Sequence, residues 1–172
     1  MTSSITMPDD RVTSTRKHIE TYRSTKSYDH NEGLSCCFRQ WRADSHCQLI
    51  HGYALAVKFV FATHHLDERN WCFDFGALKE VKAWLHSLLD HTMIVAADDP
   101  ELPRFHNLAD AKLVDLRILP GVGCEALARY VHDHVATIAR EKTNGRVWLE
   151  SVEIREHAGN SAIYELHSHT PH

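Results

Sequence analysis

Long apolar runs, long basic runs and paired cysteine motifs are all missing from this 172-residue sequence. No apolar stretch approaches the roughly 20 residues that a membrane-spanning helix needs. A net charge of −4 without a long basic run argues against nucleic-acid binding through phosphate neutralisation. The five cysteines form no CxxC pair, their number is odd and no signal peptide precedes them, so we expect reduced thiols in a cytoplasmic protein.

The residues that are present have the balance of a globular protein. Hydrophobic residues make up 43% and charged residues 24%, which is typical of a soluble folded chain rather than a disordered one. The length is sufficient for a core that needs no disulfides. Fifteen histidines are many for this length and favour a metal or proton-transfer site.

The N-terminal part of the chain differs from the rest. Residues 1–31 are rich in Ser, Thr, Asp, Arg and Lys and show no apolar period. This pattern predicts a flexible arm, or one that orders only against a neighbouring subunit. Residues 32–172 contain no repeat and no low-complexity tract, and we expect them to form a single domain.

Alternating apolar residues predict two pairs of strands. Residues 34–42 and 51–62 are separated by a short polar stretch, which predicts an antiparallel hairpin. Near the C-terminus, residues 148–156 are predicted to form a strand with Trp148, Val152, Ile154 and Glu156 on one face. Residues 161–166 are its expected hairpin partner.

Two helices are expected between these strand pairs. Asp74 can cap the first, whose apolar stripe runs from Leu78 to Leu89 at helical spacing. The second runs from about Cys124 and ends before Asn144, with a loop and a short strand at 114–118 between the helices. Strand pairs that bracket helices on one side of a four-stranded antiparallel sheet make an α+β fold of order ββααββ.

The first candidate for chemistry is Cys47, which lies just before the strand that His51 opens. An imidazole or a metal beside the thiol would lower its pKa and make it a competent base or nucleophile. The same spacing is equally compatible with a buried, inert cysteine.

The second candidate is the pair Asp90 and His91 after the first helix. A carboxylate can fix the tautomer of an adjacent imidazole and raise its basicity. The alternative, which the spacing alone favours, is that His91 merely complements the dipole at the helix C-terminus.

Two glutamates are candidates for binding. Glu156 shares the apolar parity of Ile154, so its carboxylate should point toward the core side of the sheet and need a partner. A guanidine-like pair of N–H groups on a ligand would satisfy it; a frayed strand end would instead put Glu156 in solvent. Glu125 falls in the first turn of the second helix, where a negative charge suits the dipole.

Together these features resemble the 6-pyruvoyl/6-carboxytetrahydropterin synthase family of the tunnelling fold. The resemblance runs from about residue 34 to residue 166 and rests on five short motifs in the expected order. They are Cys47-x3-His51-Gly52, Asp74-Phe75-Gly76-x-Leu78-Lys79, Leu89-Asp90-His91, Glu125 at a helix start, and Val152-x-Ile154-x-Glu156.

The resemblance implies a role for each candidate. Cys47, Asp90 and His91 correspond to the groups that move protons while triphosphate leaves dihydroneopterin triphosphate. Glu156 corresponds to the glutamate that anchors the pterin, and Glu125 to a glutamate near the pterin pocket. The short gap between Cys47 and His51 is more like the carboxytetrahydropterin branch, which serves queuosine and deazapurine synthesis. The family also implies a homo-oligomer, a trimer or hexamer, with pockets at subunit interfaces.

The sequence departs from the family at the zinc site. Where the family has His-x-His, this chain has His51-Gly52-Tyr53, and the segment from Phe38 to Arg42 lacks the third histidine. His51 and His46 are the remaining candidate ligands, and two imidazoles make a poor zinc site. A lyase acting on a reduced pterin is therefore one reading. A pterin- or purine-binding protein without zinc chemistry is the second, and a metal-free enzyme on a similar ring is the third.

Overall fold

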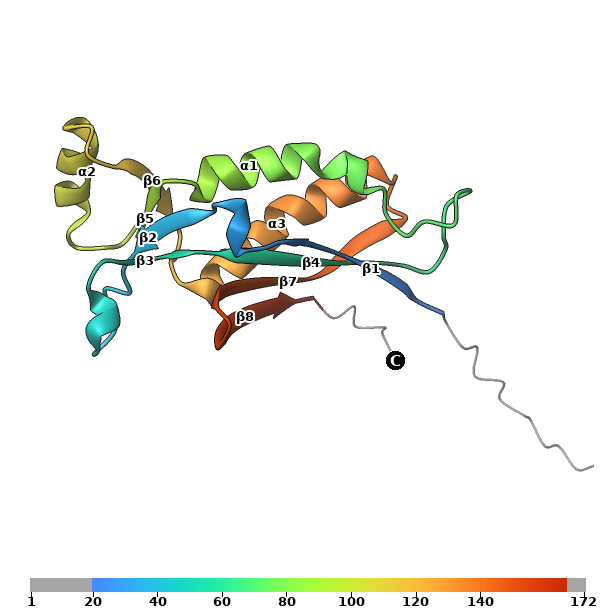
Figure 1. Cartoon of the computed structure of the whole chain (residues 1–172), viewed down its shortest axis with the longest axis horizontal. Helices are drawn as coiled ribbons and strands as arrows, with labels where there is room; N and C mark the ends of the chain where they lie inside the picture. The colour runs from blue at the N-terminus through green and yellow to red at the C-terminus, as the bar shows by residue number, and fades with distance from the viewer. Residues whose placement is uncertain (1–19, 167–172) are drawn as a thin grey trace, which may run out of the picture.

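The computed structural model of the chain describes residues 20–166 (Figure 1). In chain order its elements are β1 (Tyr22–Tyr28), η1 (His30–Glu32), β2 (Ser35–Phe38), η2 (His46–Gln48), β3 (His51–Ala54), β4 (Ala56–Thr63), η3 (Phe75–Leu78), α1 (Lys79–Leu89), β5 (Thr92–Ala96), α2 (Leu102–Asp110), β6 (Asp115–Leu119), α3 (Cys124–Lys142), β7 (Val147–His157) and β8 (Asn160–Glu165). None of the helices between residues 20 and 166 is long and apolar enough to cross a membrane.

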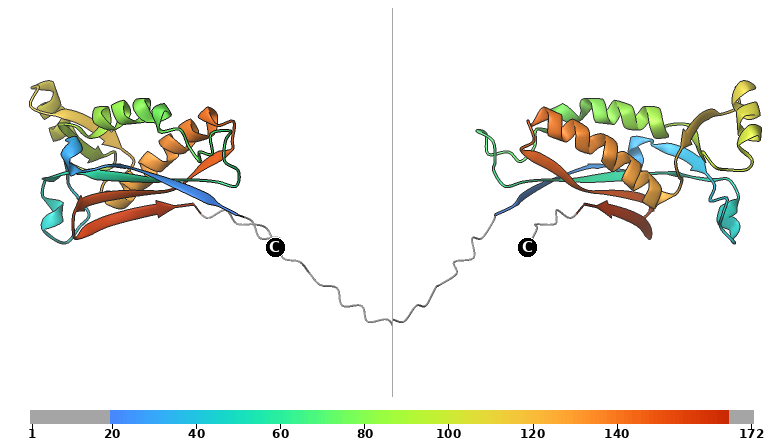
Figure 2. Two further views of the ribbon diagram at one scale, coloured as in Figure 1. Left: turned by 45° about the vertical axis from the view of Figure 1, so that its right-hand side comes forward. Right: turned by 180° about the vertical axis from the view of Figure 1, so that it is seen from behind.

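The larger sheet is four-stranded and antiparallel, in the order β1-β4-β7-β8. Helices α1 and α3 lie together on one of its faces, as the views from front and back agree (Figures 1 and 2). The α+β class with a four-stranded antiparallel sheet and two helices on one face is therefore confirmed. The observed order of elements is longer than the expected ββααββ.

A second sheet has the order β3-β2-β5-β6. The hairpin of β2 and β3 is antiparallel, as expected, while β5 and β6 add in parallel. Only Leu55 separates β3 from β4, so one extended segment contributes to both sheets. The place expected for residues 34–42 in the larger sheet is taken by β1.

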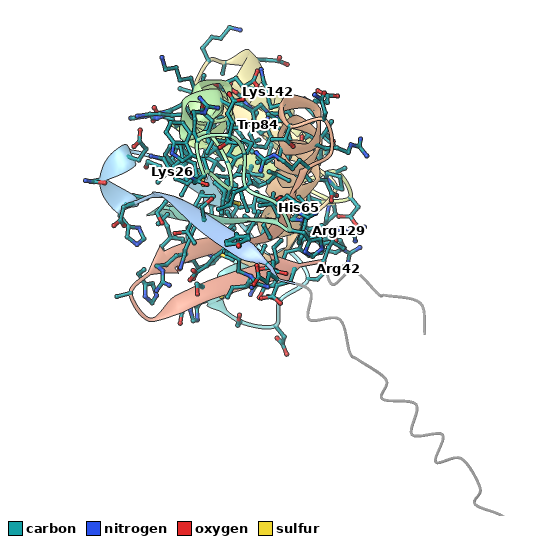
Figure 3. The ribbon with its side chains drawn as sticks, turned by 90° about the vertical axis from the view of Figure 1, so that its right-hand side faces the viewer. Lys26, Arg42, His65, Trp84, Arg129 and Lys142 are labelled. Carbon is teal, nitrogen blue, oxygen red and sulfur yellow. The ribbon has the colours of Figure 1, made fainter. Side chains whose placement is uncertain are left out.

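The main core lies between the larger sheet and the two long helices. Leu55 and the inward-facing residues of β4, Val57, Phe59 and Phe61, are at most 1% exposed. At the outer surface Trp84 of α1 stacks on His134 of α3 at a centroid distance of 3.9 Å. Figure 3 shows Trp84 and Lys142 in this helical layer, where Lys142 of α3 also pairs with Glu80 of α1.

Three expectations are corrected by these elements. Residues 22–28 of the expected flexible arm form the edge strand β1; residues 1–19 lie outside the described part of the chain. The segment expected to be mostly loop contains β5 and α2. Trp148 does not face the core, because a bulge at Glu150 shifts the parity of β7 and turns Val147 and Leu149 inward.

Candidate functional site

A cavity of about 480 Å³ opens where η2, β3, the start of α3 and the β7–β8 hairpin meet. Five of the seven predicted site residues line it, namely His46, Cys47, His51, Glu125 and Glu156. The remaining lining residues are Phe38, Gln40, Tyr53, Gly123, Cys124, Gly159, Asn160, Ser161 and Ala162.

Cys47 is held on the wall of this cavity by a short helical turn. Ser45 caps η2 by accepting a hydrogen bond from the backbone N–H of Cys47 at 3.3 Å. The carbonyl of Cys47 accepts the backbone N–H of Gln40 at 2.9 Å, which ties η2 to the chain that follows β2. Cys47 is half-buried rather than enclosed in the core.

Aromatic rings pack beside His51. Its ring lies 5.1 Å from that of Phe38 and 5.7 Å from that of Tyr53, centroid to centroid. The Nδ1–H of His51 donates to the carbonyl of Leu49 at 2.7 Å. Burial, followed by the charge of Glu156, raises the pKa of Tyr53, so its phenol stays protonated.

Glu156 lines the cavity at a β-bulge in strand β7. Arg155 pairs with Ser161 and His157 pairs with Asn160, so Glu156 is bulged out of the ladder. Its carboxylate is half-buried and hydrogen-bonded to the thiol of Cys124. Burial first, then the charge of Glu156, raises the pKa of that thiol to about 12. Within residues 20–166 Glu156 forms no ion pair, so a ligand can supply the cationic or N–H partner.

The start of α3 is held against the cavity by Gln40. The side-chain amide of Gln40 donates to the carbonyl of Val122 at 3.0 Å. Gly123 has φ +96°, and a Cβ there would lie 2.0 Å from Gln40 Nε2. Only glycine suits this backbone and this contact. Glu125 follows in the first turn of α3, where its exposed carboxylate faces the same cavity.

The residues in and around the cavity do not fit a zinc ion. Between residues 20 and 166, no group of three His, Cys, Asp or Glu side chains could hold a metal. His46 and His51 supply two imidazoles, short of the three or four ligands that zinc takes. The segment where the third imidazole is expected points elsewhere: Arg42 pairs with Asp98 at 2.7 Å and the Trp41 Nε1–H donates to the same carboxylate.

Asp90 and His91 are not in this cavity. His91 lines a different hollow over β2, β3 and β5, which shares only Tyr53 with the first. Within the pair, Asp90 Oδ1 lies 2.5 Å from His91 Nδ1, so the two act together as a carboxylate–imidazole pair. The side chain of His91 is 91% exposed.

Several lining residues were not predicted from the sequence. The sequence indicates Cys124 only as the start of a helix, and Gln40 only as a member of the segment from Phe38 to Arg42. Asn160 and Ser161 line the cavity from the start of β8. The polar Asn160–Ser161 pair following Glu156 is a signal that could have suggested them, whereas the approach of Gln40 to Gly123 depends on tertiary packing.

Comparison with known proteins places this geometry in one family. The family model described as 6-pyruvoyl tetrahydropterin synthase matches residues 28–167. A 6-carboxy-5,6,7,8-tetrahydropterin synthase of Aquifex aeolicus is 26% identical over 137 residues, which cover 77% of this chain and 84% of that protein.

Solved structures show the same fold at lower identity. An uncharacterized protein from Wolinella succinogenes has a TM-score of 0.72 and 19% identity, over 85% of this chain and 98% of that one. The 6-pyruvoyl tetrahydropterin synthase of Plasmodium falciparum has a TM-score of 0.61 and 14% identity, over 84% of this chain and 96% of that one.

Proposed function

Since the chain belongs to the 6-pyruvoyl tetrahydropterin synthase family, we propose that it is a lyase acting on dihydroneopterin triphosphate or a related pterin. The family and its synthase-type relative support a pterin synthase-like enzyme. The choice of substrate and the roles of individual residues are the proposal.

The observation that carries the proposal is the carboxylate of Glu156, which forms no ion pair within residues 20–166. It is half-buried at the cavity wall, where the thiol of Cys124 is a weak donor to it. A pterin ring presents a 2-amino group and a ring N–H side by side, and a carboxylate accepts such a pair in two charge-assisted hydrogen bonds. Tyr53, packed against the buried Phe38, provides aromatic surface for a planar ring in the same cavity.

Cys47 and the Asp90–His91 pair are proposed to move the protons. Loss of triphosphate requires that a base takes a proton from the pterin side chain while the carbon–oxygen bond to triphosphate breaks. The sulfur of Cys47 lines the cavity with Glu156 and can act on an atom of the bound side chain. No step is assigned to zinc, because the donor set described above does not fit it.

The separation of the Asp90–His91 pair from Cys47 supports an assembled site. We propose that several copies of the chain associate, and that the pair of one copy reaches the cavity of another. Isologous or cyclic association of identical chains places the same two surfaces opposite each other at every interface. This arrangement lets one cavity hold Cys47 of one chain and His91 of its neighbour.

The test of activity uses the full chain and dihydroneopterin triphosphate. Release of triphosphate and formation of a new pterin are followed together, for the wild type, for Cys47→Ala and for the control Cys72→Ala. Cys72 is buried beside Phe61, away from the cavity. We expect turnover by the wild type and the control but not by Cys47→Ala. Pterin binding without turnover by the wild type would refute the lyase and leave a binding protein.

The test of assembly mixes two inactive variants, Cys47→Ala and His91→Asn. Asparagine is chosen because His91 has φ +56°, a conformation that Asn tolerates. If two chains share each site, random mixing after co-expression restores activity at about a quarter of the sites in a symmetric oligomer. Mixtures that remain inactive, with both variants folded, would contradict a shared site.

A further inference from the structure

Asp90 and His91 lie at the end of a hydrogen-bonded series of side chains in which carboxylates and imidazoles alternate. Glu32 Oε1 lies 3.1 Å from His86 Nε2, and His86 Nδ1 lies 3.1 Å from Asp90 Oδ2. Asp90 Oδ1 then lies 2.5 Å from His91 Nδ1. The four side chains come from η1, from α1 and from the turn between α1 and β5. None of the motifs that identify the family contains Glu32 or His86.

The geometry of this series determines which ring nitrogens of His86 carry a proton. Both ring nitrogens of His86 face carboxylate oxygens, which only accept, so both nitrogens must donate and the ring is an imidazolium. The hydrogen bonds that His86 donates to Asp90 and Glu32 accordingly raise its pKa. The imidazolium in turn occupies Oδ2 of Asp90, so that Oδ1 is the oxygen left to face His91.

The neighbouring charges support the same protonation pattern. Hydrogen bonds from Lys82, followed by those from His86, lower the pKa of Glu32. Hydrogen bonds from His91, followed by those from His86, lower the pKa of Asp90. The guanidinium of Arg117 on β6 is the other cation beside this end of α1, and it is bound to the carbonyl of Ser87 and to Asp115.

At the far end of this hydrogen-bonded series, Nε2 of His91 is the atom that can accept a proton. When the neutral ring of His91 donates its Nδ1–H to Asp90, Nε2 is the ring nitrogen left as an acceptor. The backbone holds the ring in place, because the N–H of His91 donates to the carbonyl of Ser35 at 2.7 Å and φ is +56°. Such left-handed geometry in a non-glycine residue is uncommon and is found where surrounding structure enforces it.

We propose that Glu32 and His86 are positioning residues, which fix the Asp90 carboxylate and thereby hold His91 in the tautomer whose Nε2 accepts a proton. The tautomer is a property of the folded chain alone. Its catalytic meaning rests on the proposed function, in which His91 moves a proton of the pterin side chain.

The experiment is NMR of the full chain labelled with ¹⁵N in the histidine rings, titrated with pH. The variants are His86→Leu and the conservative Glu32→Gln, with His106→Leu on the exposed side of α2 as the matched control. His91→Asn and His86→Leu identify the two ring signals by their loss.

In the wild type at pH 7 we expect His86 protonated on both nitrogens, and we expect the neutral form of His91 to carry its proton on Nδ1. His86→Leu should shift His91 toward the Nε2–H tautomer, and Glu32→Gln should lower the pH at which His86 titrates. His106→Leu should change neither. Because Glu32→Gln replaces a surface carboxylate by an amide of the same shape, it keeps the test open if His86→Leu does not fold.

Two results would overturn the proposal. The first is a neutral His86 in the wild type at pH 7, and the second is an unchanged His91 tautomer in folded His86→Leu. Where the wild type turns over pterin, His86→Leu should also lower kcat about tenfold, a part of the 10²- to 10⁴-fold that a positioned acid–base group contributes. If the wild type has no turnover, the proposed lyase activity is refuted. The NMR result still tests whether Glu32 and His86 position His91.

Discussion

Replacing Glu156 by Gln tests the proposed pterin anchor with little change of shape. In the wild type the carboxylate accepts the 2-amino group and the ring N–H of the pterin as two charge-assisted hydrogen bonds. The amide keeps one oxygen acceptor but presents an NH₂ group to the second donor. The variant therefore loses one charge-assisted bond, gains a contact between two donors and removes the charge from the other bond.

The magnitude follows from these contacts. A hydrogen bond to a charged group contributes about 1.5–3 kcal/mol, and an unpaired donor left in a half-buried site adds to the loss. We expect binding to weaken by about 3 kcal/mol, which corresponds to an increase in Kd of about 100-fold.

The assay is isothermal titration calorimetry with a reduced pterin, with Glu150→Gln as the control. Glu150 lies on the same strand and pairs with Arg23 instead of lining the cavity. A Kd for Glu156→Gln within threefold of the control would refute the anchoring role. A readout without ligand is the Cys124 thiol, whose pKa should fall when the charge of Glu156 is removed, so that alkylation becomes faster at a given alkaline pH.

Three further predictions address catalysis and stability. Cys47→Ala should lower kcat by about 10²- to 10⁴-fold while the pterin Kd stays unchanged; a matching loss of affinity would contradict a purely chemical role. Gly123→Ala should lower the free energy of unfolding, measured in urea, by about 3 kcal/mol. Gly145→Ala should lower it by only about 1 kcal/mol, because Gly145 also has a positive φ, +78°, but open space around it. Equal losses would contradict the role of the close contact between residue 123 and Gln40. Asp99→Asn should cost about 3 kcal/mol at neutral pH, because it leaves the partly buried Arg39 without its buried carboxylate partner. Since Arg39 lowers the folded-state pKa of Asp99, that stabilisation is present above the ordinary Asp pKa and is lost as pH falls through the folded value; a difference in stability that persists in acid would contradict it.

Sequence patterns predicted the larger features of the fold because those features follow local rules. The inward face of β4 repeats every second residue, and Asp74 caps the turn that leads into α1 by accepting the N–H of Gly76. In contrast β5 is buried at all five positions, so it lacks alternation, and α2 buries only Phe105. The strand therefore has no alternation to reveal it, whereas the short stripe of Leu102, Phe105 and Leu108 was a helical signal present in the sequence.

The candidate site was predictable in its residue types but not in its geometry. The spacing of Cys47 and His51 and the position of Glu156 were visible in the sequence, and the structure brings all three to one cavity. The bulge at Glu156 depends on the pairing of β7 with β8, which no single strand reveals. The link from His86 to Glu32 joins residues 54 positions apart in the chain, so only the folded structure shows it.

The most direct measurement of the central claim is a crystal structure of the full chain with a reduced pterin bound. The account predicts that the ring lies in the cavity between η2, β3 and the β7–β8 hairpin, with its 2-amino group and ring N–H on the carboxylate of Glu156. A pterin bound outside this cavity, or bound within it without contact to Glu156, would contradict the account.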